Sequence, residues 1–318
     1  MSAGSCRPEA TIVVVPRERF SLMERCVKQI YAHTSEPFEL IVLDTNSPRC
    51  VAQKMKQWEQ THSNCRVIRS EKFLYPYEAK NLACGHITTE WAVFVDSDVM
   101  VAPDWLTHLL TAARETAARV VHPLYLVEQA GQLKIHMTDG QIKEVNRNGQ
   151  KKIHLVMGHV AQDVSETRGL ARKESDFVEF HTFMIRRDLL REMGPFEETN
   201  LAEDVAYSLR LWEKKEKIVF EPKAVITYVA GPPFERYDLP YFRFRWNLKM
   251  ARESTDRLKE RFPLTEEYVK GKLSWVAYHH SRISPGFGLA RRFRRWSGQM
   301  QSRLVERARR LTPALKEK

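Results

Sequence analysis

The amino-acid sequence predicts an α/β protein built on a mostly parallel sheet, followed by a helical C-terminal extension. Over residues 11–119, short and continuously apolar runs alternate with segments whose apolar residues recur every three to four positions. Strands that are apolar throughout occur in parallel sheets that helices cover on both faces. After the sequence GPP at 231–233 the strand-like runs end, and the pattern becomes helical.

The first repeat of this pattern is a β-branched run at 11–15 (TIVVV), followed by a segment with Phe20, Met23, Val27 and Ile30 on one helical face. The alternation then continues. Further strands are expected at 39–44, 65–69 and 91–95, and further helices at 51–60, 77–86 and 103–119. Ligands bind such sheets at the carboxyl ends of the strands, so the residues after each strand are the first candidates for a site.

Residues 132–157 interrupt the alternation. Two alternating stretches at 133–137 and 152–156 flank the turn-rich sequence NRNG at 146–149, which predicts a hairpin. The polar segment 161–176 predicts a surface loop. A strand at 177–185, a helix at 200–214 and strands at 217–220 and 224–229 complete the α/β region.

Composition indicates a folded chain with an unevenly placed positive charge. The 318 residues are 43% apolar, which is enough for a sizeable core and excludes a wholly disordered chain. The formal charge is +11, and residues 286–318 carry +8 of it. A basic excess points to an anionic partner such as a phosphate, a nucleic acid or a lipid headgroup.

The cysteines suggest neither a disulfide framework nor a zinc site. There are five, all in the first third of the chain, without C-x-x-C spacing. The N-terminal sequence lacks the apolar stretch of a secretory signal, and no window reaches the roughly 18 apolar residues of a membrane span. We expect a cytoplasmic protein, or one that associates peripherally with a membrane.

Carboxylates follow two of the predicted strands. Asp44 ends the run VLD at 42–44, and Asp96 and Asp98 belong to the triplet DSD that follows the strand at 91–95. At the carboxyl ends of parallel strands these side chains converge, and carboxylate oxygens are ligands for Mg²⁺ or Mn²⁺ on a diphosphate. The alternative is that Asp-Ser-Asp forms a turn that caps the next helix.

The sequence NLAED at 200–204 also has two interpretations. Asn200 with Glu203 three residues later is a capping-box pattern, so Glu203 can be purely structural. Asp204 is not needed for the box and is placed to take a proton from an attacking hydroxyl. An acidic helix start can also simply complement the helix dipole.

Taken together, these motifs resemble family 2 glycosyltransferases, which are inverting enzymes with the GT-A fold. The resemblance covers roughly residues 11–229 and rests on the order of the motifs and their position at strand ends. The motifs are Pro16 with Arg19 after TIVVV, VLDTNS at 42–47, KNLA at 80–83, WAVFVDSDVMVAPDW at 91–105, MIRR at 184–187 with GPF at 194–196, and the stretch from Glu203-Asp204 to Arg210. The aromatic and basic stretch at 241–247 (YFRFRWN) also looks like the region after the catalytic domain in some bacterial members.

The resemblance implies a role for each matching residue. Pro16 and Asp44 line the pocket for the base and ribose of the nucleotide, and Asp96 contacts the ribose side. Asp98 ligates the divalent metal on the diphosphate, and Asp204 is the general base.

Three further positions are less settled by the resemblance. Lys80, where the family commonly has Arg, either contacts the nucleotide or is an exposed helix charge. Many members carry a metal-ligating His in the strand that here reads VITY at 225–228, with Tyr228 near the expected position, so the third ligand is open. His181 can contact acceptor or metal, but a lone His on a strand is more often a core residue.

Other nucleotide enzymes fit the sequence less well. A nucleotide-sugar pyrophosphorylase normally has a Gly-rich loop after the first strand, whereas this chain has VPRER at 15–19. No P-loop sequence occurs, and no GxGxxG follows a strand, which argues against kinases and dehydrogenases.

The C-terminal tail predicts a basic amphipathic helix over residues 289–311. Apolar residues recur every three or four positions there, with arginines around them. Such a helix can pack on the catalytic domain or on a second subunit, or it can lie on an anionic membrane surface. Nucleic acid is the least favoured of these partners.

The sequence therefore predicts a catalytic GT-A domain over 1–235 and a helical extension over 236–318. The predicted reaction is metal-dependent transfer, with inversion, from a nucleotide-diphosphate sugar to a hydroxyl of a carbohydrate or lipid-linked acceptor. The alternative is a catalytically degenerate GT-A domain that acts as a basic scaffold at a membrane or nucleic acid. Asp44, Asp98 and Asp204 argue against it, because a scaffold does not need them.

Overall fold

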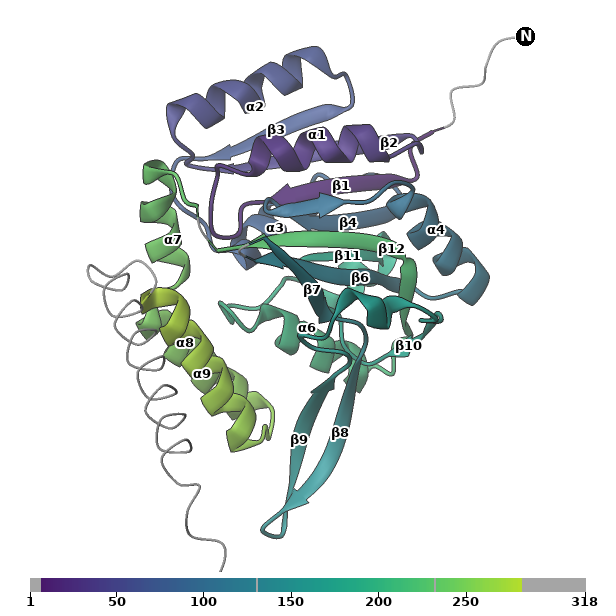
Figure 1. Ribbon diagram of the computed structural model, residues 1–318, viewed down its shortest axis with the longest axis vertical. Helices are drawn as coiled ribbons and strands as arrows, with labels where there is room; N and C mark the ends of the chain where they lie inside the picture. The colour runs from purple at the N-terminus through teal and green to yellow at the C-terminus, as the bar shows by residue number, and fades with distance from the viewer. Residues whose placement is uncertain (1–6, 130, 232, 282–318) are drawn as a thin grey trace, which may run out of the picture.

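The computed structural model describes residues 7–281 except 130 and 232, and its centre is a ten-stranded sheet (Figure 1). The strands of this sheet are β1 (Ala10–Val15), β2 (Phe38–Thr45), β3 (Cys65–Ser70), β4 (Trp91–Asp96), β5 (Val99–Val101), β6 (Val120–Gln129), β7 (Gln132–Met137), β10 (Lys173–Ser175), β11 (Thr182–Arg186) and β12 (Ile218–Ala230). Their order is β10-β12-β6-β11-β4-β1-β2-β3, with β5 on β12 and β7 on β6.

Helices flank this sheet and continue beyond it. They are α1 (Met23–His33), α2 (Arg49–Thr61), α3 (Pro76–Cys84), α4 (Trp105–Thr116), α5 (Arg187–Met193), α6 (Glu203–Glu213), α7 (Leu239–Arg245), α8 (Leu248–Arg261) and α9 (Glu266–Ser281), with short 3-10 turns at Val164–Thr167 and Arg236–Asp238. Side chains of β1 alternate between two apolar clusters: Ile12 and Val14 belong to the one with α1, α2 and α4, and Val13 and Val15 to the one with α3 and α5. The predicted sheet with helices on both faces is confirmed.

The parallel strands β3, β2, β1 and β4 bring their carboxyl ends to one edge. β1 pairs with both β2 and β4, so that Val15 lies opposite Asp96. The neighbouring strand β11 runs antiparallel to β4. Its amino end therefore meets the carboxyl end of β4, and the residue before it, His181, arrives at the same edge.

Strand β6 was not predicted, because Pro123 in its middle argues against a strand. The structure accommodates this proline at a register shift. Partner strand β12 pairs Glu221 with Pro123 and then Val225 with Leu124, so the residues between them bulge. The strands predicted at 217–220 and 224–229 are therefore one strand interrupted by this bulge.

The predicted hairpin is present with different arms. It consists of β8 (Gly140–Arg147) and β9 (Gln150–Met157), whereas the stretch 133–137 pairs with β6 as β7. The prediction was wrong about the first arm. The strand expected at 177–185 also begins only at Thr182, because residues 177–181 approach the sheet as a loop.

The extension is helical through α9, as predicted. Figure 1 shows α7, α8 and α9 on one side of the molecule, with the β8–β9 hairpin projecting away from the sheet. The α8–α9 connection is joined to the hairpin, because the Ile153 N–H donates to the Pro263 carbonyl at 2.8 Å. The basic helix predicted at 289–311 lies outside the described residues. Within 7–281, no helix is long and apolar enough to cross a membrane.

Candidate active site

The Asp-Ser-Asp triplet lies at the carboxyl end of β4, where the chain turns into β5. Backbone bonds hold this turn on three sides: the Asp96 N–H donates to the His181 carbonyl, the Ser97 N–H to the Val15 carbonyl, and the Val229 N–H to the Asp98 carbonyl. Asp98 is fully buried, and Asp96 nearly so. The next element is a strand, so the alternative that the triplet caps a helix does not apply.

His181 completes a cluster of three potential metal ligands. Its Nδ1 lies 3.1 Å from Asp96 Oδ2, and one ligand atom from each of Asp96, Asp98 and His181 falls within 4.8 Å of the others. The His181 ring stacks on Tyr228 with centroids 4.1 Å apart. Burial lowers the pKa of His181 to about 3, which keeps the imidazole neutral, the form that binds metals.

The cluster fits a divalent cation such as Mn²⁺ or Mg²⁺. Two carboxylates and an imidazole are a suitable donor set. Asp98 Oδ1 is buried and has no hydrogen-bond partner among the described residues, an arrangement that is unfavourable unless something else satisfies the oxygen. Burial also raises the pKa of Asp96 to about 7 and raises that of Asp98, which a bound cation would reverse.

Sequence reasoning left the third ligand open, with Tyr228 near the expected position, and it named His181 as a contact to acceptor or metal or, more often, a core residue. The structure places the His181 imidazole in the cluster, with the Tyr228 ring stacked against it. Only the antiparallel pairing of β11 with β4, with Thr182 opposite Val95, brings His181 there. No local pattern in the sequence predicts this pairing.

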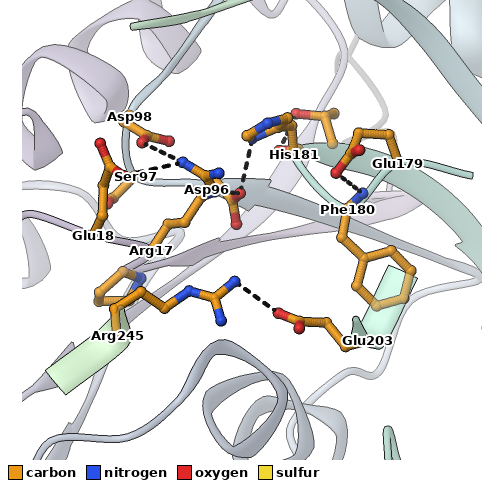
Figure 2. Close-up of polar contacts among 12 residues, drawn as sticks. Arg17, Glu18, Asp96, Ser97, Asp98, Glu179, Phe180, His181, Glu203 and Arg245 are labelled. Carbon is orange, nitrogen blue, oxygen red and sulfur yellow. Dashed lines mark hydrogen bonds and ion pairs between the residues drawn. The ribbon is translucent and has the colours of Figure 1, made fainter. Parts of the chain in front are cut away.

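Arg17 is a residue of the site that sequence reasoning missed. Its Nη1 lies 3.4 Å from Asp98 Oδ2 and 3.5 Å from Glu18 Oε2, and its Nε lies 3.4 Å from Asp96 Oδ2. Figure 2 shows the guanidinium among these three carboxylates. Its side chain is 8% exposed. Burial alone would lower the pKa of Arg17, but the carboxylates of Asp98 and Glu18 raise it.

A cavity of about 570 Å³ opens beside the cluster. Arg17, Lys80, Asp96, His181 and Asp204 line its polar part. The apolar part is lined by Met137, Met157, Val160, Phe177, Phe180, Leu201, Val205, Tyr268 and Trp275. Its size is typical of sites for small molecules.

Lys80 is a buried residue of this cavity and not an exposed helix charge. It is 1% exposed, and its Nζ lies 5.0 Å from the centroid of the Phe180 ring. Burial lowers its pKa. The interpretation of Lys80 as a solvated surface charge is therefore wrong.

The start of α6 differs from the predicted capping box. The N-cap residue is Ala202, without a side-chain cap bond. Asn200 and Glu203 instead both bind Arg245 of α7: Glu203 Oε1 lies 3.2 Å from Arg245 Nη2, and Asn200 Oδ1 accepts from Nη1. Glu203 therefore pairs with the extension and does not cap the helix, and it also lines the cavity.

Asp204, in the first turn of α6, lines the cavity. Its carboxylate is 13% exposed and lies 3.9 Å from Lys272 Nζ of α9. Burial raises the pKa of Asp204 to about 6, although Lys272 opposes the shift. A carboxyl group with this pKa is ionised at neutral pH and still basic enough to accept a proton.

Pro16 and Asp44 are not among the residues that line the cavity. Asp44 Oδ1 accepts from the Ser47 N–H at 2.8 Å, and Oδ2 pairs with Arg69. The Pro16 carbonyl accepts from the Tyr241 hydroxyl at 2.9 Å. Pro16 follows β1, which pairs with β4, and Asp44 lies near the carboxyl end of β2, which pairs with the other side of β1.

Comparisons with solved structures place this fold among GT-A glycosyltransferases. GalNAc-T7 with UDP, GalNAc and Mn²⁺ aligns with a TM-score of 0.56 at 12% identity, over 87% of this chain and 59% of that one. TarS of S. aureus with UDP-GlcNAc gives 0.53 at 17% identity, over 88% and 75%. The mannosyltransferase PcManGT of Pyrobaculum calidifontis with GDP-Man and Mn²⁺ gives 0.51 at 19%, over 87% and 71%.

The family follows from the sequence comparison. The family model described as Glycosyl transferase family 2 matches residues 11–194, and the chain belongs to this family. The pre-mycofactocin glycosyltransferase of Mycobacterium tuberculosis is 23% identical over 227 residues, which are 71% of this chain. The match covers 44% of that relative, so the chain spans less than half of its length.

Proposed function

We propose that the protein is an inverting glycosyltransferase that moves a sugar from a nucleotide-diphosphate sugar to an acceptor hydroxyl, with Mn²⁺ or Mg²⁺ as cofactor. The observation that carries this proposal is that Asp204 lines the same cavity as Asp96 and His181, two of the three potential ligands in the buried cluster. Solved neighbours of the same fold bind UDP or GDP-Man together with Mn²⁺, which supports this choice of donor and metal.

On the donor side, Asp98 and His181 would hold the cation, and Asp96 would contact both the cation and the ribose. The chemistry that a divalent cation would supply there is neutralisation of charge on the departing diphosphate. The Lys80 amine, buried in the wall of the cavity, contacts the nucleotide as a second positive charge. Pro16 and Asp44, at the ends of the adjacent strands, contact the base and the ribose.

On the acceptor side, Asp204 takes the proton from the attacking hydroxyl. Lys272 favours the ionised form of Asp204 and is itself positioned by α9. The hydroxyl oxygen attacks the anomeric carbon as the bond to the diphosphate breaks, and attack from the opposite face inverts the configuration.

The acceptor is proposed to be a carbohydrate or a lipid-linked group. The wall of the cavity beyond Asp204 carries apolar side chains, including Leu201, Tyr268 and Trp275. An aromatic side chain such as Trp275 packs against the apolar face of a sugar ring or against a lipid-linked group.

Calorimetric titration of UDP and GDP, each with and without Mn²⁺, tests the proposal. We expect nucleotide affinity that depends on the metal and is lost in Asp98→Asn. Asp188→Asn is the matched control, because Asp188 follows β11 at the opposite edge of the sheet and is half exposed. A panel of nucleotide sugars, assayed for metal-dependent hydrolysis, then identifies the donor. Absence of metal-dependent nucleotide binding would instead support the degenerate scaffold.

A further inference from the structure

The guanidinium of Arg17 uses the same carboxylate oxygens that a cation would need. Asp98 Oδ2 is bound to Arg17 Nη1, and Asp96 Oδ2 is shared between Arg17 Nε and His181 Nδ1. Within the part of the chain that the structure describes, the other Asp98 oxygen, Oδ1, has no hydrogen-bond partner. A divalent cation that binds this cluster must therefore share its ligands with Arg17 or displace it.

Sharing is unfavourable because the site is buried. Arg17, Asp96 and Asp98 are at most 6% exposed. In such surroundings water screens charges weakly, so a dication placed on Asp98 repels a guanidinium strongly at a distance of only a few ångströms. Without the cation the same contacts are favourable, since the guanidinium neutralises carboxylates that would otherwise be buried and unpaired.

Displacement is possible because Arg17 also faces the cavity. Its guanidinium lies over the Tyr228 ring at 5.2 Å and over the Trp246 ring at 5.8 Å, and it lines the wall together with Lys80. A guanidinium presents a planar fork of donors that matches phosphate oxygens. If a diphosphate binds beside Arg17, its oxygens can accept hydrogen bonds from the guanidinium after a cation has displaced the guanidinium from Asp96 and Asp98.

We propose that Arg17 is a built-in counter-ion of the metal site, which occupies Asp96 and Asp98 in the metal-free protein and transfers to the donor diphosphate when metal and donor bind. This inference rests on the proposed function. Arg17 thus contacts the donor directly and makes binding of the metal conditional on the nucleotide.

The proposal predicts how the affinities for Mn²⁺ and for the nucleotide depend on each other and on Arg17. In the unaltered protein, Mn²⁺ alone must compete with Arg17 and binds weakly. A nucleoside diphosphate relieves the competition, so each ligand strengthens the other by the same factor. Replacement of Arg17 by a neutral side chain should raise the affinity for Mn²⁺ alone and lower the affinity for the nucleotide.

Arg17→Met and Arg17→Lys in the full chain test this, with free Mn²⁺ measured by electron paramagnetic resonance with and without UDP or GDP. We expect Arg17→Met to bind Mn²⁺ alone at least about tenfold more tightly than the unaltered protein, because the positive charge that competes for the carboxylates is removed. At saturating Mn²⁺ it should bind the nucleotide more weakly. Arg17→Lys keeps the charge and should keep weak Mn²⁺ binding. Arg119→Met is the matched control, because Arg119 pairs with Glu216 and Glu192 at the opposite edge of the sheet.

Thermal unfolding gives a second measurement, because Arg17→Met leaves buried carboxylates unpaired and destabilises the protein. Added Mn²⁺ should then raise its melting temperature more than that of the unaltered protein, or restore folding if the variant is unfolded without metal. Failure of Mn²⁺ to stabilise it overturns the proposal.

Two results separate this inference from the proposed function. If Arg17→Met binds Mn²⁺ no more tightly than the unaltered protein while Asp98→Asn abolishes binding, the metal site stands and the role of Arg17 is wrong. If Asp98→Asn leaves Mn²⁺ binding unchanged, the metal site itself is wrong, and both proposals fail.

Discussion

Replacement of Asp204 by Asn should stop turnover without weakening the fold. If Asp204 is the general base, kcat falls by about 10²–10⁴-fold, because an amide cannot accept a proton at neutral pH. The affinity for nucleotide and Mn²⁺ should persist, because the proposed donor ligands come from other elements. Asn has nearly the same size as Asp, so the substitution leaves no cavity.

The structure also gives the sign of the effect on stability. Burial raises the pKa of Asp204 from 3.8 to about 6, so folding disfavours its ionised form at pH 7 by up to about 3 kcal/mol. The neutral amide removes this unfavourable charge, and the net shift already includes the favourable effects of Lys272 and of the Val205 backbone N–H on the carboxylate. Asp204→Asn should therefore unfold at the same or a higher denaturant concentration while it loses activity.

The pH profile of kcat tests the same assignment in the unaltered enzyme. A base with a pKa of about 6 is about one tenth ionised at pH 5, so kcat there should be about one tenth of its plateau. Lys272 lowers this pKa, while Glu179 and Glu203 raise it. Lys272→Met should move the midpoint of the acidic limb upward by about one pH unit.

Lys270→Met is the matched control for the pH profile, because Lys270 is exposed on the same helix and does not line the cavity. It should leave the midpoint unchanged. The reasoning is refuted if Asp204→Asn keeps near-normal kcat, if it loses nucleotide binding as severely as Asp98→Asn, or if both lysine variants shift the profile equally.

Three other substitutions separate metal binding from support of the site. Asp98→Asn should weaken Mn²⁺ and nucleotide binding together, and an unchanged metal requirement in the assay would contradict its role. His181→Ala should weaken Mn²⁺ binding at least about tenfold, measured by paramagnetic resonance, whereas a purely structural His181 would change the melting temperature alone. Glu203→Gln should lower the free energy of unfolding by about 1–3 kcal/mol, because it removes the charge paired with Arg245, yet leave the pH midpoint of kcat within about half a unit.

The parallel half of the sheet was predictable because β1, β2 and β4 are local apolar runs and β3 continues their alternation with helices. The run TIVVV at 11–15 lies entirely within β1. The carboxylates of the Asp-Ser-Asp triplet lie at the carboxyl end of β4, as predicted. The other half depends on pairing between distant segments. Pro123 argues against a strand at β6 in the sequence, and only the bulge in the partner strand β12 accommodates it. Residues 133–137 pair with β6 and not with the next alternating stretch.

The site divides in the same way. Asp98 and Asp204 follow recognisable local patterns, and the structure places Asp98 at the predicted strand end and Asp204 in the wall of the cavity. The contribution of His181 requires an antiparallel strand to deliver it beside Asp96. Arg17 has no pattern of its own, and its importance appears only when its contacts with three carboxylates are seen.

The C-terminal extension contributes residues to the wall of the cavity. The matched family region ends at residue 194, before α6 begins. Beyond it, α9 supplies Tyr268 and Lys272 to the wall around Asp204, and Arg245 of α7 fixes Glu203 in the first turn of α6. The extension also reaches the cluster at the end of β4, because the Trp246 ring lies 5.8 Å from the Arg17 guanidinium. We therefore expect substitutions at Lys272 to change how basic Asp204 is, and substitutions at Trp246 to act on Arg17 and the metal site.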